Sequence, residues 1–132
     1  MSSKMLLSEK AKNLIDGKNF ANLAFVTPKG NPHVSPVWVD REGELILINA
    51  AEIRAKVKLL KEKQKVMLSI MNQSNPYEKV LIRGHVSEIT KKGALEQNNR
   101  MSIKYLGTVE DPDRPVGVDR VLMKIEADRI IN

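Results

Sequence analysis

Three short β-forming segments, each separated from the next by turn-forming residues, constrain the fold of this chain most strongly. Apolar and β-branched residues fill the segments, whereas Pro, Gly, Asn and Asp are concentrated in the connections. The segments cover residues 20–27, 33–39 and 44–49. Short connections of this composition join antiparallel neighbours, so the pattern predicts a meander of three strands. Pro32 and Pro36 cannot donate to a strand ladder, and we therefore expect the second strand to begin late, lie at an edge or contain a bulge.

The rest of the chain adds both strands and helices. Strands are predicted at 65–71, 77–90 and 118–125, helices at 51–64 and 92–106, and a turn at 40–43. Another helix begins after Ser8, which can cap it, and ends at Gly17, for which we expect a left-handed conformation. Gly84 interrupts its strand and is expected to mark a bulge or a tight bend.

The order of these elements predicts the fold class. The helices interrupt the strand order and do not alternate with it, which argues against a doubly wound parallel sheet. Several short antiparallel strands at this spacing are typical of a small barrel. We therefore predict a mainly β fold, a six-stranded antiparallel barrel with flanking helices, in which residues 1–132 form a single domain.

The positive charge of the chain is concentrated in one segment. Lys and Arg number 22 against 16 Asp and Glu, which gives a net charge of +6. Residues 53–65 hold six basic residues and one acidic residue, so that +5 of this charge lies in 13 residues, all but the last of them within the helix predicted at 51–64. Arg54 and Lys56 fall in its first turns, where free backbone N–H groups and the helix dipole favour a phosphate. The same charges also fit a solvated basic helix face.

Several classes of site are excluded or lack support. The chain has no cysteine, which excludes disulfides and thiolate sites. His33 and His85 lie in separate predicted strands without metal-ligand spacing, so no metal site is predicted. No glycine-rich phosphate loop occurs, and no serine has an identifiable base. No apolar stretch has the length of a signal peptide or a membrane span, and we expect a cytoplasmic protein that does not bind membranes.

The segment 32–39 contains the only tryptophan, Trp38. Its prolines interrupt backbone pairing and could free amide and carbonyl groups to meet a ring ligand edge-on. A tryptophan buried in the core near a bulge explains the same residues equally well. At this point the two interpretations stay open.

The order of four sequence blocks resembles a known family. The blocks are FANLAFVTPKGNPHVSPVWVD at 20–40, LILIN at 45–49, RAK at 54–56 and SNPYEKVLIRGHV at 74–86. Together they are similar to the pyridoxamine 5′-phosphate oxidase-like flavoproteins, including the branch that depends on the deazaflavin coenzyme F420. The resemblance implies a six-stranded Greek-key split barrel, and a homodimer with one flavin or deazaflavin in each of two clefts at its interface.

The resemblance also implies roles for particular residues. Arg54 and Lys56 would hold the cofactor phosphate, and Asn49 and Ala50 would border it. The ring system would lie along Ser35, Pro36, Val37 and Trp38, and Tyr77 would reach into a cleft of its own subunit or of the partner. Three residues depart from the family pattern, with Ala50 at a frequent Thr, Ile53 at a frequent Gly and Leu59 at a frequent Asn.

The resulting functional prediction is an oxidoreductase that binds FMN, or alternatively coenzyme F420, and passes hydride to or from a small organic substrate. Residues 127–132 lack the substrate-binding tail of true pyridoxamine phosphate oxidases, so a different substrate is expected. A flavin-binding or sensing module without turnover is the second hypothesis. The third hypothesis is a nucleic-acid-binding barrel, which a pI of about 9.6 suggests. The few aromatic residues are too scattered for a stacking platform, so no nucleic-acid partner is expected.

Overall fold

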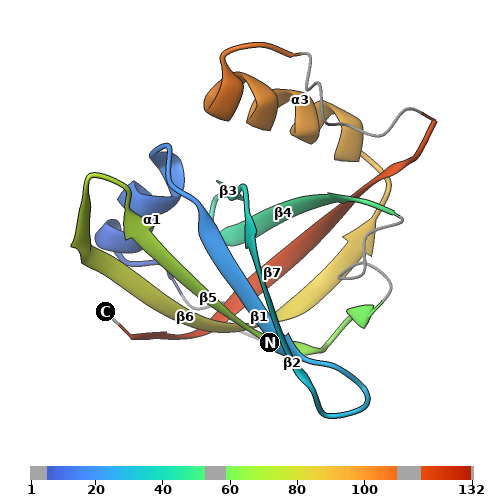
Figure 1. Cartoon of the computed structure of the whole chain (residues 1–132), viewed down its shortest axis with the longest axis horizontal. Helices are drawn as coiled ribbons and strands as arrows, with labels where there is room; N and C mark the ends of the chain where they lie inside the picture. Colours follow the sequence, from blue (N-terminus) through green and yellow to red (C-terminus); the bar gives the residue numbers. More distant parts are fainter. Residues whose placement is uncertain (1–5, 53–58, 110–116, 132) are drawn as a thin grey trace.

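The computed structural model describes residues 6–52, 59–109 and 117–131 and forms a small barrel with two helices in these ranges (Figure 1). The helices are α1 (Glu9–Asp16) and α3 (Ala94–Leu106). The strands are β1 (Ala21–Val26), β2 (Pro32–Val37), β3 (Asp40–Glu42), β4 (Leu45–Ala51), β5 (Lys65–Asn72), β6 (Asn75–Thr90) and β7 (Arg120–Ile131). Neither helix has the length and apolar character that crossing a bilayer requires.

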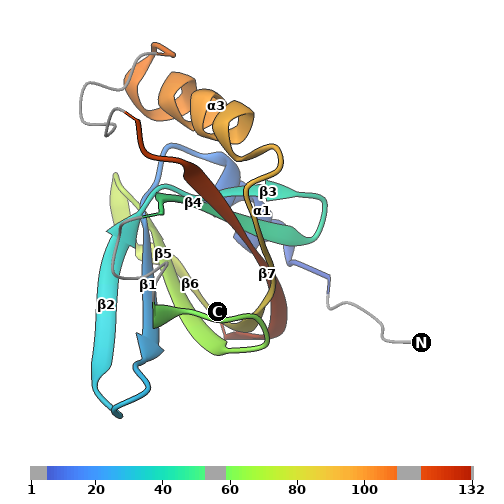
Figure 2. The ribbon, with the colours of Figure 1, turned by 90° about the vertical axis from the view of Figure 1, so that its right-hand side faces the viewer.

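The seven strands form one antiparallel sheet whose two ends are joined by a very short link. The strand order is β2-β1-β5-β6-β7-β4-β3. β2 and β3 therefore lie at opposite ends of the order, although only Trp38 and Val39 separate them in the chain. The sheet must curve round until its ends meet, and Figure 2 shows the resulting barrel. The prediction of a mainly β antiparallel barrel is confirmed.

The strand count differs from the predicted six because the turn expected at 40–43 is shorter. Asp40–Glu42 form β3 and pair with Leu45–Leu47 of β4. The turn itself is reduced to Gly43 and Glu44, and Gly43 has a φ of +62°, which glycine adopts without a steric penalty. β4 also continues through Ala51, which pairs with Arg120, so the helix predicted from this residue does not begin there. Residues 53–58 of that predicted helix lie outside the described ranges, and residues 60–64, also predicted as helical, are not part of a helix.

β2 is an edge strand, as its prolines predict. Thr27 N donates to Asn31 O at 2.8 Å, and this bond sets the alternation of hydrogen-bonded pairs along β1 and β2. Continuing that alternation, the backbone groups of Pro32, Val34 and Pro36 point away from β1. The missing N–H groups of both prolines therefore lie on the free edge, where no ladder bond is lost.

Gly84 lies where β6 and β7 bend, and the predicted bulge is confirmed. The register between these strands shifts between Arg83 and Gly84. A Cβ atom at this position would lie 2.4 Å from Glu126 O and 3.0 Å from Ile125 Cγ2. Only glycine allows the two strands to approach this closely, which lets the long β6 curve from one side of the barrel to the other.

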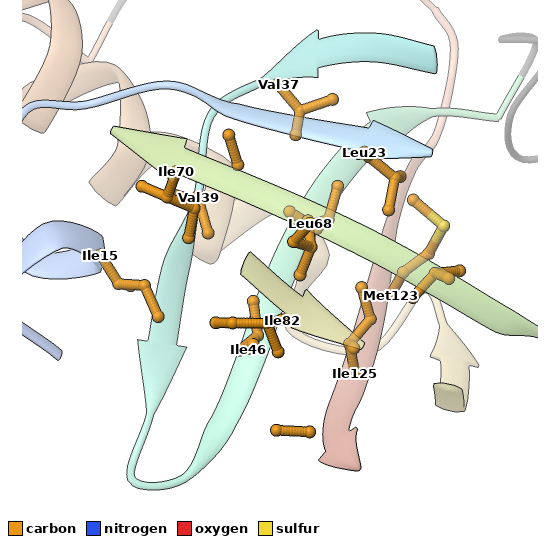
Figure 3. Packing of buried hydrophobic residues seen from close by; sticks show 14 of the residues in the cluster. Ile15, Leu23, Val37, Val39, Ile46, Leu68, Ile70, Ile82, Met123 and Ile125 are labelled. Carbon is orange, nitrogen blue, oxygen red and sulfur yellow. The ribbon is translucent and has the colours of Figure 1, made fainter. Parts of the chain in front are cut away.

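Alternate residues of the strands fill the barrel interior with aliphatic side chains. Leu23, Leu68, Ile82, Ile46 and Ile125 come from five different strands and are fully buried (Figure 3). α1 adds Leu14 and Ile15 to the same cluster. This period-two burial is typical of strands that turn one face towards a core.

Helix α1 ends at Gly17 as predicted, but the left-handed conformation predicted for this glycine is wrong. Ser8 caps its start, with Oγ accepting a hydrogen bond from Ala11 N at 3.1 Å. Gly17, however, has a φ of −72° and is extended, not left-handed. The amide of Asn19 explains the difference, because its Nδ2 donates to Leu14 O at 2.9 Å and satisfies a free carbonyl of the last turn. Helix α3 forms within the range predicted for it.

Candidate functional site

Trp38 lies in the link between β2 and β3 and is part of an aromatic stack. Its ring is 5.1 Å from that of Tyr105 on α3, with an angle of 5° between the planes. Tyr105 also stacks with Phe20, at 5.5 Å and 26°. Trp38 stays partly exposed while Tyr105 is buried. The structure therefore supports neither a deeply buried tryptophan nor a free one, but an indole fixed by α3.

Two side chains of α3 hold this link in place. Tyr105 Oη donates to Asn19 O at 2.6 Å and accepts from Val39 N at 3.1 Å. Lys104 Nζ donates to Val39 O at 2.9 Å and to Ile15 O at 2.6 Å. These contacts satisfy both backbone groups of a residue that lies between two strands. Burial raises the pKa of the Tyr105 hydroxyl and lowers the pKa of the Lys104 ammonium group.

The predicted ring-contact residues of β2 alternate between the two faces of the barrel wall. Val37 belongs to the interior cluster, and Ser35, two residues before it, shares that face. Ser35 Oγ is buried and has no hydrogen-bond partner among the residues that the structure describes. Pro36 is exposed on the opposite face. By the alternation along β2, the main-chain groups of Ser35 and Val37 point towards β1, so a ligand outside the barrel would meet the outward-facing carbonyl of Pro36 at the free edge of the strand.

Asn49 and Ala50 also point to opposite faces. Ala50 is buried in the interior cluster. Asn49 Nδ2 donates to Ala94 O at 2.6 Å and to Gln97 Oε1 at 2.8 Å, and its Oδ1 accepts from Arg120 Nε at 2.9 Å. The Asn49 side chain therefore attaches α3 to the barrel wall, which leaves its main chain for the predicted role beside a phosphate.

Of the remaining predicted residues, Tyr77 alone lies within the described part of the chain. Tyr77 stands near the start of β6, beside the β5–β6 turn, and is 89% exposed. Arg54 and Lys56 lie outside the described residues. Their roles, like that of Tyr77, stay predictions.

A groove of about 1030 Å³ crosses the outside of the sheet, and the sequence analysis did not predict it. It follows one row of residues that pair in register across five strands. The row runs Val34, Ala24, Met67, Arg83 and Arg129, from β2 through β1, β5 and β6 to β7. One end of the groove is therefore apolar and the other is cationic. Of the residues predicted to bind cofactor, those within the described ranges do not line it.

A histidine and two carboxylates lie beside the cationic end of this groove. His85 Nδ1 is 2.9 Å from Asp128 Oδ1, and Nε2 is 3.0 Å from Glu126 Oε2. Lys65 pairs with His85 from the neighbouring strand. The hydrogen bond to Asp128 and the two negative charges raise the pKa of His85, although desolvation partly opposes them. The two ring nitrogens face different carboxylates, which makes this group an ion pair between strands.

A family model described as pyridoxamine 5′-phosphate oxidase matches residues 7–132. The chain therefore belongs to the pyridoxamine 5′-phosphate oxidase family, and the resemblance found in its sequence blocks is confirmed. No curated protein matches it.

Solved structures share the fold over nearly the whole chain. An F420 reductase is 26% identical, with a TM-score of 0.78, over 95% of this chain and 98% of that one. A conserved hypothetical protein from Mycobacterium tuberculosis is 20% identical, with a TM-score of 0.71, over 98% and 86%. HutZ, the heme storage protein from Vibrio cholerae, is 13% identical, with a TM-score of 0.65, over 96% and 94%. The last two identities are so low that they show a common fold alone.

Proposed function

We propose that this protein is a cytoplasmic, homodimeric oxidoreductase that binds FMN or coenzyme F420 and transfers hydride between the cofactor and a small organic substrate. The observation that carries the proposal is the family match over residues 7–132. The similarity to an F420 reductase, which spans 95% of this chain, supports a flavin-like cofactor over other ligands of the fold.

The arrangement around Trp38 fits a planar cofactor. The indole is fixed on α3 through Tyr105 yet stays partly exposed, and the exposed edge of β2 leads directly to it. Arg54 and Lys56 would hold the phosphate, and the free edge of β2 at Pro36, together with Trp38, would orient the ring. When bound, the cofactor supplies the hydride chemistry, while the protein supplies position and electrostatics.

A dimer is expected from the apolar residues on the outside of the barrel. Leu95 is 51% exposed and Ile103 is 53% exposed, both on α3, which covers the barrel away from the groove. A second copy would bury them, and in the family arrangement Tyr77 would then reach a cleft. Light scattering measures the oligomeric state, and a monomer would count against the dimer and its shared clefts.

Titration with FMN and with coenzyme F420, followed by the visible spectrum, tests the cofactor. We expect a displaced absorption band for one of them. Replacing both Arg54 and Lys56 with alanine should weaken binding by more than a hundredfold, because each charged hydrogen bond contributes about 1.5–3 kcal/mol. The control variant, Lys29→Ala with Lys92→Ala, removes the same charge from exposed positions elsewhere.

The outcomes separate the alternatives. No affinity of the wild-type protein for either cofactor would refute the proposal. Equal affinity of the double variant and the wild type would refute the phosphate assignment alone. Reduction of the bound cofactor by a nicotinamide or a reduced deazaflavin, followed by reoxidation with substrates, distinguishes an enzyme from a protein that only holds the cofactor.

A further inference from the structure

Arg83 and Arg129 lie directly opposite each other on β6 and β7. Both are exposed and both line the groove. Opposed residues of an antiparallel pair have neighbouring side chains, and two like charges at such positions repel each other. Neither guanidinium has a hydrogen bond or an ion pair with any described residue. The nearest acid of the bulge, Asp128, is instead paired with His85.

The opposite end of the groove presents apolar side chains in the same register. Val34 pairs with Ala24, and Ala24 also pairs with Met67, which in turn pairs with Arg83. Neighbouring strands are about 4.8 Å apart, so the four steps of this row span roughly 19 Å. A groove of about 1030 Å³ is large enough for a small organic molecule. Its two ends differ in the chemistry that they would recognise.

We propose that the groove binds an organic anion with an apolar body. Arg83 and Arg129 hold the carboxylate, phosphate or sulfonate group, since two adjacent guanidinium groups offer planar, bidentate donors to such groups. Val34, Ala24 and Met67 contact the apolar part. Calling this ligand the substrate of the oxidoreductase rests on the proposed function, whereas the anion site itself does not.

A pair of dyes that differ by one charged group tests the assignment. 8-Anilinonaphthalene-1-sulfonate carries the anion, and N-phenyl-1-naphthylamine has the same rings without it. Both fluoresce more strongly in an apolar site. We expect the wild-type protein to bind the sulfonate dye more tightly than the neutral dye, and to lose this preference at high salt.

Single variants then assign the contacts. Arg83→Gln and Arg129→Gln should each weaken binding of the sulfonate dye about tenfold and leave the neutral dye unaffected. Because each variant removes a like-charge repulsion, the ligand-free protein should keep or exceed its wild-type melting temperature, which a structural role would not produce. Arg100→Gln, on the exposed side of α3, removes the same charge outside the groove and should change nothing.

Four results would overturn the inference. The first is an affinity for the sulfonate dye that stays unchanged in both groove variants. The second is an Arg100→Gln protein that loses as much affinity for this dye as the groove variants do. If the wild-type dimer binds neither dye and the groove variants become monomeric, the groove is the subunit interface. If FMN or coenzyme F420 displaces the sulfonate dye at cofactor-saturating concentrations, the groove is the cofactor cleft. Arginine-dependent dye binding in a protein that binds neither cofactor would refute the proposed function and keep the anion site.

Discussion

Replacing Gly84 with alanine should lower the free energy of unfolding by about 3 kcal/mol, near the upper end of overpacking costs. The added Cβ would lie 2.4 Å from Glu126 O, whereas real Cβ contacts essentially never fall below 3.0 Å, so at least 0.6 Å of movement is needed. Glu126 cannot move freely, because it pairs with His85 on one side and with Leu45 on the other. The cost therefore includes disturbance of two strand ladders.

Gly17→Ala is the matched control, because Gly17 also lacks a positive φ and also has a close neighbour. There the added Cβ would lie 2.9 Å from Asn19 Nδ2, only 0.1 Å closer than real Cβ contacts allow, so a small shift of this side chain relieves the contact. We expect a loss of about 1 kcal/mol or less, near the average for single substitutions.

Urea denaturation and thermal melting measure the difference between these variants. For a chain of this size, 3 kcal/mol corresponds to a decrease of about 10 °C in Tm. The urea concentration at the midpoint of unfolding should decrease. The slope of the unfolding free energy against urea concentration should not change, because the surface exposed on unfolding stays the same. A Gly84→Ala protein as stable as the wild type, or no less stable than Gly17→Ala, would show that the bend does not depend on glycine.

Two further predictions concern the pH dependence and the aromatic stack. Asp128 raises the pKa of His85 in the folded state. The protonated ring therefore stabilises the fold, fully so below the pKa of about 6.5 that the histidine has in the unfolded chain. This stabilisation is lost as the pH rises through the pKa of His85 in the folded protein. His85→Gln should therefore lower stability to urea more at pH 5.5 than at pH 9, and an equal effect at both would contradict the ion pair. Tyr105→Phe keeps the stacked ring but removes the hydroxyl that holds the β2–β3 link. We expect this change to lower the free energy of unfolding by about 1–2 kcal/mol. It should also make Trp38 more accessible to quenching by acrylamide. Because Trp38 is the only tryptophan, its emission reports on this link alone, and unchanged quenching would refute the holding role of the hydroxyl.

Most of the fold could be predicted because the strands carry their burial pattern in the local sequence. β3 was missed for a physical reason: its three residues, Asp40–Glu42, have turn-forming composition, and only pairing with β4 makes them a strand. The conformation of Gly17 was missed because the cap of α1 comes from Asn19, which acts through its side chain. Both errors arise where a contact overrides a local preference.

The site was predicted less completely because its geometry depends on cross-strand register. The position of Trp38 could be inferred from the proline-rich segment around it, but its partner Tyr105 lies on a helix that follows four further strands. The groove depends on register to an even greater degree. Arg83 and Arg129 look like ordinary surface residues in the sequence, and only the bulge between β6 and β7 places them opposite each other.

The free edge of β2 has a further consequence, for association between chains. A strand that adds to a sheet edge needs alternating donors and acceptors along it. Among Pro32, Val34 and Pro36, whose backbone groups face outward, three carbonyls can accept a hydrogen bond but only Val34 can donate one. This edge is therefore a poor template for fibre-like stacking of one barrel on another. It remains open to a molecule that brings its own N–H groups.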